Sequence, residues 1–239
     1  MKNPPQIIFE DEHILIVNKP AGFLSIPDRY NPKLYNLKTF FDNRGQAVFM
    51  VHRLDKDTSG VICLAKDAAS HKRLNQQFAS RKVKKEYLCL SIGVLFEKTG
   101  LIDQPIAKSQ SRTGRMVVHK SGKPSQTRFE VVQEFGHYSL IKAEPLTGRQ
   151  HQIRVHMSAI GHPLLVDPIY NNKDGFYLSE IKRKYNLGKD QEERPLIGRT
   201  TLHAAAISFE HPHSKETVRF EAPLPKDMNA VIRQLEKWA

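Results

Sequence analysis

Cysteine, tryptophan and long apolar runs are scarce in this chain of 239 residues, which has two cysteines and one tryptophan. Cys63 and Cys89 both lie in apolar runs typical of strands. They argue against a disulfide framework or a zinc site and indicate buried, reduced thiols. No apolar run approaches the roughly 20 residues that span a bilayer, so we expect no membrane segment. The acidic residues 10–12 argue against a signal peptide, which leaves the cytoplasm as the expected location.

Acidic residues are missing altogether between Asp103 and Glu130. The chain has 37 Lys and Arg against 25 Asp and Glu, a formal net charge of +12. Such a balance indicates a polyanionic partner, most often nucleic acid, although a generally basic, solvated surface would give the same totals. The acid-free segment contains Lys108, Arg112, Arg115, Lys120, Lys123 and Arg128, here called the basic strip. A second group of basic residues comprises Lys72, Arg73, Arg81, Lys82, Lys84 and Lys85. Both groups would favour a phosphate backbone through counterion release.

Alternating apolar residues and turn signals predict few helices and three hairpins, which cover residues 7–17, 128–144 and 201–221. The predicted strands are 7–9, 14–17, 60–65, 87–95, 128–134, 138–144, 201–210 and 216–221. A helix is expected from the cap Asp67 to about residue 81, and another at the C-terminus from about residue 228. A third is expected after residue 149, with Ile153, Met157 and Ile160 on its buried face, and residues 37–41 also have helical potential. This pattern predicts an α+β fold, with a largely antiparallel mixed sheet flanked by helices and loops.

No repeat, low-complexity segment or Pro/Ser-rich linker divides the chain. We therefore predict one catalytic domain over residues 1–239. The charged stretch at about 171–200 is expected to be an exposed insertion with one helix near residues 178–185.

The densest group of functional side chains lies at residues 51–60, VHRLDKDTSG, just before an apolar strand. A calcium-binding loop fails because its twelfth position, which requires a glutamate, is Lys66. Two readings remain open: a structural turn in which Asp55 and Asp57 bind local N–H groups, and a nucleophilic or acid/base carboxylate at Asp55 beside Arg53.

A second polar segment, residues 146–156, LTGRQHQIRVH, opens a helix whose other face is apolar. Arg154 placed against Asp55 would keep that carboxylate ionised, as a nucleophile must be. The histidines 151, 156 and 162 lack the spacing and glutamate of a zincin helix, so we expect no metal site.

Together these segments resemble the RluA-type family of pseudouridine synthases. The resemblance is carried by His52-Arg53-Leu54-Asp55 with Thr58-Ser59-Gly60, by 146–156 continuing to Gly161-His162-Pro163 and Asp167-Pro168-x-Tyr170, and by Leu202-His203-Ala204. Asn18 to Gly22, Lys85-Glu86-Tyr87 and Gly122-Lys123-Pro124 match in type and order, so that the likeness spans residues 7–223. Many members carry an S4-type RNA-binding domain at the N-terminus. This chain has no room for one and resembles the short members.

The resemblance implies a role for particular residues. Asp55 is the catalytic aspartate, Tyr87 packs on the flipped uracil and moves a sugar proton, and Arg154 pairs with the catalytic carboxylate. Arg53 enters the base stack in place of the extruded uridine. The substrate-binding surface is further assigned to His52, Leu54, Thr58, Arg149, Lys108, Arg112 and Arg115. Two of these have alternatives: Arg149 could cap the helix instead, and Thr58 could hold the turn.

The implied activity is isomerisation of uridine in a loop of tRNA and/or 23S-type rRNA after base flipping. The product is an isomer, so no cofactor is expected, and the expected partner is structured RNA alone, bound by a monomer without an obligatory protein partner. The alternative is a catalytically inactive RNA-binding module or chaperone, which the intact Asp55, Tyr87 and Arg154 argue against. Deamination or hydrolytic base removal is disfavoured because no zinc-ligand set or water-activating carboxylate pair is evident.

Overall fold

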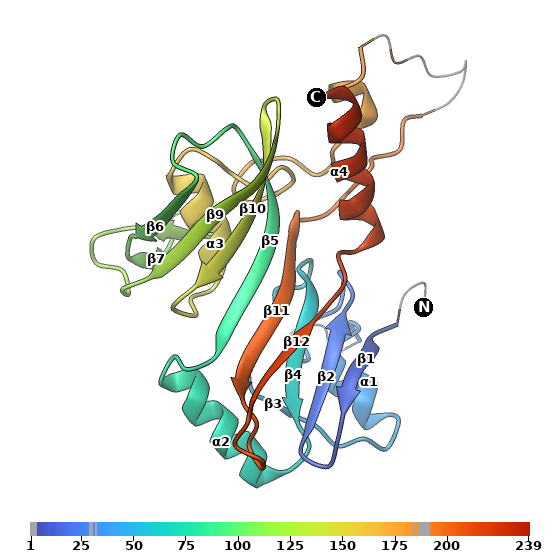
Figure 1. Ribbon diagram of the computed structural model, residues 1–239, viewed down its shortest axis with the longest axis vertical. Coiled ribbons are helices and arrows are strands. Elements are labelled where there is room, and N and C mark those ends of the chain that lie inside the picture. The colour runs from blue at the N-terminus through green and yellow to red at the C-terminus, as the bar shows by residue number, and fades with distance from the viewer. Residues whose placement is uncertain (1–3, 29–30, 32, 184, 186–191) are drawn as a thin grey trace. The chain divides into compact units, whose positions relative to one another are not determined.

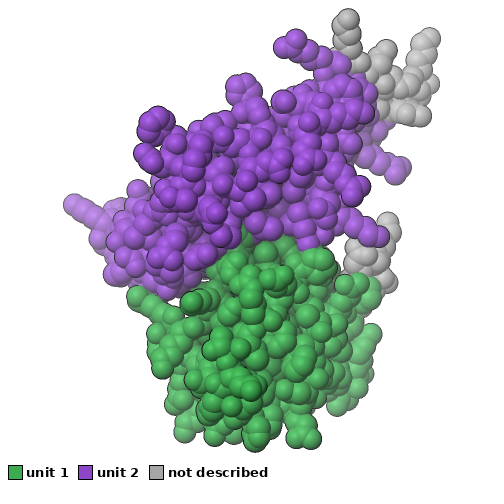
Figure 2. All heavy atoms as spheres, in the orientation of Figure 1, with its two compact units in different colours: residues 1–87, 203–223 green, residues 88–202, 224–239 purple. Residues whose placement is uncertain are grey.

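The computed structural model describes residues 4–28, 31, 33–183, 185 and 192–239. It divides into two compact units, shown in different colours in Figure 2. Unit 1 comprises residues 1–87 and 203–223, and unit 2 comprises residues 88–202 and 224–239. The single catalytic domain over residues 1–239 stays a prediction. Residues 184 and 186–191 of the predicted insertion lie outside the described residues.

Unit 1 is built on a mixed sheet whose central strands are buried on both faces. Its strands are β1 (Gln6–Glu10), β2 (Ile14–Lys19), β3 (Phe49–Met50), β4 (Ser59–Ala65), β11 (Leu202–Glu210) and β12 (Thr217–Glu221). The order is β1-β2-β4-β11, with β12 paired to β11 and β3 to β4. Only the β4–β11 pair is parallel among these. The two predicted hairpins, β1–β2 and β11–β12, are confirmed.

Both helices of unit 1 begin at a side-chain cap. In α1 (Leu37–Asp42), Asn36 accepts the Thr39 N–H, and in α2 (Ala68–Ala79), Asp67 accepts the Ser70 N–H. Hydrogen bonds from the Ser70 hydroxyl and N–H lower the pKa of Asp67 to about 2. The predicted cap at Asp67 is therefore confirmed, and Leu74 fixes the buried face of α2.

Unit 2 contains an antiparallel sheet and a separate small hairpin (Figure 1). The strands are β5 (Lys84–Ile92), whose residues up to Tyr87 belong to unit 1, β6 (Thr99–Asp103), β7 (Ile106–Lys108), β8 (Met116–Val118), β9 (Gln126–Phe135) and β10 (Tyr138–Pro145). Their order is β5-β10-β9-β6, while β7 pairs with β8. The predicted β9–β10 hairpin is confirmed, with Phe135 opposite Tyr138. Together with unit 1, these strands confirm the α+β class with a mostly antiparallel mixed sheet.

The helices of unit 2 are α3 (Gln152–Ala159) and α4 (Lys226–Trp238). Figure 1 shows α3 against β9 and β10, where Ile153 and Met157 are buried. In α4, Met228, Val231 and Leu235 form the buried face that the sequence predicts. The predicted helix near 178–185 is wrong: among the described residues of that stretch, a single 3-10 turn forms at Leu178–Glu180, with no buried side chain. In that turn the Glu180 carboxylate accepts the N–H of Tyr177, and the Ile181 N–H donates to the Leu178 carbonyl three residues back, the bond typical of a 3-10 turn.

Cys63 and Cys89 are buried free thiols, as predicted. Burial raises the pKa of Cys63 and raises that of Cys89 to about 12, so that both stay protonated. Within the described part of the chain, no helix is both long and apolar enough to cross a membrane.

Candidate active site

The segment that carries Asp55 runs from the end of β3 to the start of β4 in unit 1. Val51 and Leu54 are 9% and 6% exposed and belong to the hydrophobic core of that unit. Arg53 is exposed, and Asp55 is half-buried. The Thr58 N–H donates to the Asp55 carbonyl over 3.2 Å and closes a turn. Apolar side chains thus anchor the segment while its charged side chains stay toward solvent.

His52 faces inward from this segment. Its Nε2 atom accepts the N–H of Cys63 on β4 over 3.0 Å, and its ring stacks on Phe78 of α2 at 4.7 Å between centroids. Burial, with a further contribution from the charge of Lys85, lowers the pKa of His52 to about 3. The ring is therefore neutral at physiological pH, which the acceptor role of Nε2 requires.

Buried Lys19 holds the backbone on the far side of Asp55. Its ammonium group donates to the carbonyls of Pro20, Phe23 and Lys56 at 3.1, 2.8 and 3.0 Å, and its side chain has no exposed surface. The Gly22 N–H donates to the same Lys56 carbonyl over 2.9 Å. Carbonyl oxygens thereby replace the water that a buried ammonium loses.

The end of the segment is fixed to β11. Ser59 Oγ lies 2.9 Å from Nδ1 of His203, whose Nε2 lies 3.2 Å from the Ala222 carbonyl. A carbonyl only accepts, so Nε2 carries the hydrogen, and in the neutral ring Nδ1 accepts from the Ser59 hydroxyl. At Gly60, with φ +117°, an added Cβ would lie 2.1 Å from the Ala204 carbonyl oxygen. Only glycine fits this close approach of β4 and β11.

Tyr87 lies in unit 1 with Asp55 and packs against the same core. Burial raises the pKa of its phenol, and the negative charge of Asp55 raises it further. Two of the three residues predicted to be catalytic are thereby brought within electrostatic range of each other.

Arg154, the third, lies on α3 in unit 2. Its Nε and Nη2 atoms bind both carboxylate oxygens of Asp167 at 2.7 and 2.8 Å, and the two side chains are 6% and 0% exposed. Asp167 Oδ1 also accepts the N–H groups of Ile169 and Tyr170, and the Tyr170 ring lies 5.1 Å from the guanidinium carbon. Asp167 therefore sets the orientation of Arg154. The pairing of Arg154 with Asp55 stays a prediction.

The remaining residues assigned to substrate binding fall into two groups. Leu54 is buried in the core of unit 1, and Thr58 is 1% exposed, with a hydroxyl that has no hydrogen-bond partner among the described residues. Both therefore support the segment from within. In unit 2, Arg149 donates from Nε and Nη2 to the Pro124 carbonyl at 3.3 and 3.2 Å.

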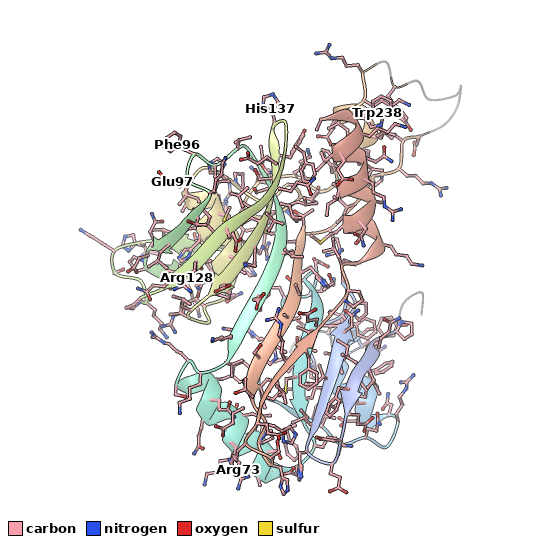
Figure 3. All side chains as sticks on the ribbon, in the orientation of Figure 1. Arg73, Phe96, Glu97, Arg128, His137 and Trp238 are labelled. Carbon is pink, nitrogen blue, oxygen red and sulfur yellow. The ribbon has the colours of Figure 1, made fainter. Side chains whose placement is uncertain are left out.

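The basic strip forms part of unit 2, on the β7–β8 hairpin and the segment leading into β9. Lys108, Arg112, Lys120, Lys123 and Arg128 are exposed and Arg115 is half-buried. Arg128 projects from β9 (Figure 3) and lies 3.5 Å from Glu144. From the second basic group, Arg73 on α2 binds the Pro212 carbonyl, and burial lowers the pKa of Lys85. Arg73 is exposed but tied to the chain of unit 1 by this bond, and Lys85 is half-buried. The exposed residues of the basic strip can meet phosphates.

Several residues of the site carry no role in the sequence analysis, namely Lys19, Ser25, Asp167 and His203. Lys19, Asp167 and His203 lie in stretches that carry the family resemblance, and that resemblance was the signal by which they could have been found. Ser25 lies in a stretch without a pattern. Among the described residues, no group of three His, Cys, Asp or Glu side chains is arranged to hold a metal ion.

Comparison with known proteins places this arrangement in a family. Residues 13–159 match the family described as RNA pseudouridylate synthase. Ribosomal large subunit pseudouridine synthase D of Nitrosomonas europaea is 36% identical over 239 residues, covering 97% of this chain and 65% of that protein. The dual-specificity RNA pseudouridine synthase RluA of Escherichia coli is 36% identical over 228 residues, covering 92% of this chain and 96% of that protein.

Solved structures agree with the fold. Human RNA pseudouridylate synthase domain containing 1 has a TM-score of 0.70 and 27% identity, covering 98% of this chain and 95% of that one. The chain spans about two thirds of the length of the Nitrosomonas relative and nearly all of the Escherichia one. The chain therefore belongs to the RNA pseudouridylate synthase family, and the predicted likeness to its RluA-type members is confirmed.

Proposed function

We propose that this chain isomerises uridine to pseudouridine within RNA, with Asp55 as the nucleophile. The observation that carries the proposal is the anchoring of residues 52–59 by buried partners on either side of Asp55, in a chain whose family is one of isomerases. Such anchoring holds one carboxylate in a fixed position, which is what a nucleophile at a crowded carbon requires.

The reaction is balanced within the nucleotide. The bond from N1 to C1′ breaks, the uracil turns, C5 bonds to C1′, the C5 proton leaves and N1 gains a proton. Attack of Asp55 at C1′, its addition at C6, and a glycal route that it assists each use the ionised carboxylate. No redox partner or group donor enters the balance.

Tyr87 contributes a neutral phenol to this chemistry. Its raised pKa keeps the hydroxyl protonated at neutral pH, so that in the resting protein it offers a ring face and a hydrogen-bond donor. The ring face can pack on the extruded uracil, and the hydroxyl can donate a hydrogen bond to the bound nucleotide. A sugar proton moved by Tyr87 would require a hydrogen-bonded partner that takes the phenolic proton in the same step.

Arg53 is an exposed cation two residues before Asp55, and we assign it to the base stack. Extrusion of a nucleotide costs a few kcal/mol, and it costs least in loops. A guanidinium that stacks in the vacated space offsets part of that cost. We therefore propose a loop uridine of tRNA or 23S-type ribosomal RNA as the substrate, bound by a cytoplasmic monomer, and retain Arg154 as the partner of Asp55.

The direct test is conversion by the purified protein. Incubated with tRNA and with large-subunit rRNA transcripts, without any added cofactor, it is expected to produce pseudouridine at defined positions, read by carbodiimide mapping. If the protein binds tRNA and rRNA but converts uridine in neither, the result would instead support the alternative function, a catalytically inactive RNA-binding module.

RNA affinity is expected to fall steeply with salt because phosphate contacts release counterions. Replacement of the exposed Lys108, Arg112 and Lys120 by Gln should lower the slope of log affinity against log salt by about 2 to 3, since each contact contributes roughly 0.7 to 0.9. The matched control removes the same charge from α4, at the exposed Lys226, Arg233 and Lys237, and should leave the slope unchanged. Equal slopes for the two triple variants, measured by titration at several salt concentrations, would remove the basic strip from the RNA interface.

A further inference from the structure

One serine hydroxyl binds both backbone groups of the residue directly before Asp55. Ser25 Oγ donates to the Leu54 carbonyl over 3.0 Å and accepts the Leu54 N–H over 3.0 Å. Ser25 is 3% exposed, and the Leu54 side chain is 6% exposed. The hydroxyl therefore replaces a neighbouring strand at a buried point where Leu54 needs a donor and an acceptor.

The same short stretch of chain reaches the backbone on the other side of Asp55. The Lys56 carbonyl accepts hydrogen bonds from Gly22 N–H and from Lys19 Nζ, at 2.9 and 3.0 Å. Residues 19–25 thus bind the residue before Asp55 and the residue after it. The backbone is thus held both before and after the residue from which the carboxylate projects.

Ser25 is itself held in place by its neighbours. Leu24 donates its N–H to the Tyr35 carbonyl and accepts the Leu37 N–H, both at 3.0 Å, and Phe23 is 5% exposed in the core. Ser25 therefore lies between a buried phenylalanine and the start of α1, and its hydroxyl has little freedom to choose other partners.

We infer that Ser25 is a positioning residue for Asp55, whose hydroxyl fixes the backbone that presents the nucleophile. The inference rests on the proposed function. Removal of the hydroxyl leaves the N–H and carbonyl of Leu54 buried without this partner, and the segment shifts to satisfy them. Because a displacement of about 1 Å at a reacting group costs on the order of a hundredfold in rate, the effect belongs to the chemical step and not to RNA binding.

The test compares Ser25→Ala with Ser70→Ala. Ser70 is equally buried in unit 1, at 4% exposure, and its hydroxyl binds Asp67 at the start of α2. Both variants lose one buried hydroxyl, so both are expected to lower the melting temperature. Only Ser25→Ala is expected to lower kcat for uridine conversion, by about 10- to 100-fold, with KM for RNA unchanged. Ser25→Thr, which keeps the hydroxyl, should recover most of kcat.

Wild-type kcat in Ser25→Ala would overturn the inference, and so would an equal fall in kcat in both alanine variants, since that reports only stability. If Ser25→Ala does not fold, Ser25→Cys keeps the side-chain volume with a much weaker donor and should show the same loss of kcat; wild-type kcat there would overturn the inference. Conversion by the wild-type protein is measured first. Its absence contradicts the proposed function, whereas activity that is indifferent to Ser25 contradicts only this inference.

Discussion

Asp55→Ala is expected to lose uridine conversion by more than about a thousandfold while it still binds RNA, because the substitution removes the nucleophile and no charge of the basic strip. The loss should appear in kcat, in single-turnover assays with saturating protein. The hydrogen bonds of His52, Leu54 and Ser59 that anchor this segment do not involve the Asp55 side chain, and the melting temperature is measured beside kcat to show that the variant folds.

The control for Asp55→Ala is Asp42→Ala, which removes another carboxylate of unit 1. Asp42 forms an exposed ion pair with Lys38 on α1 at 2.7 Å, and such pairs contribute between about 0 and 1 kcal/mol. This variant should convert uridine at the wild-type rate. Full activity in Asp55→Ala would show that the nucleophile is another residue, and loss of RNA binding would show that Asp55 supports folding or binding.

Features set by neighbours in the sequence could be predicted. The cap of α2 could be predicted because Asp67 binds the N–H of Ser70, only three residues further along the chain. The hairpins could be predicted because strands with alternating apolar residues flank short turns. β5 begins at Lys84, three residues earlier than its apolar run suggests, since backbone pairing also admits the polar Lys84, Lys85 and Glu86. The local sequence pattern therefore predicted which strands and helices form better than it predicted their first and last residues.

Contacts between distant residues could not be predicted. Ser25 binds a residue 29 positions away, and Ser59 binds His203 across 144 positions. Nothing in the stretch around Ser25 distinguishes a positioning hydroxyl from a loop serine. Asp167 was recognised as part of a motif, yet its pairing with Arg154 depends on how the chain after α3 turns back, which no periodicity encodes.

The Arg154–Asp167 pair is expected to be the most costly ion pair of unit 2 to break among those described. Asp167→Ala leaves a guanidinium that is 6% exposed without its carboxylate, and removes the acceptor for two backbone N–H groups. Loss of one partner of a buried pair typically costs about 3 to 5 kcal/mol, so the midpoint of urea unfolding should fall accordingly. Arg154→Met should cost a similar amount, because it leaves the fully buried Asp167 carboxylate without its cation.

Arg199 and Asp227 offer the matched comparison, since they form an equally bidentate pair at 2.7 and 2.9 Å in the same unit, with Asp227 36% exposed. Water can solvate the Asp227 carboxylate that Arg199→Met leaves behind, so Arg199→Met should cost about 1 kcal/mol, less than Arg154→Met. Equal losses for Arg154→Met and Arg199→Met would show that burial of the remaining carboxylate does not set the cost. The double variant Arg154→Met with Asp167→Leu removes both members of this pair, so its loss should be smaller than the sum of the two single losses. If the double variant regains stability relative to the single variants and still fails to convert uridine, Arg154 acts in the reaction and not only in the fold.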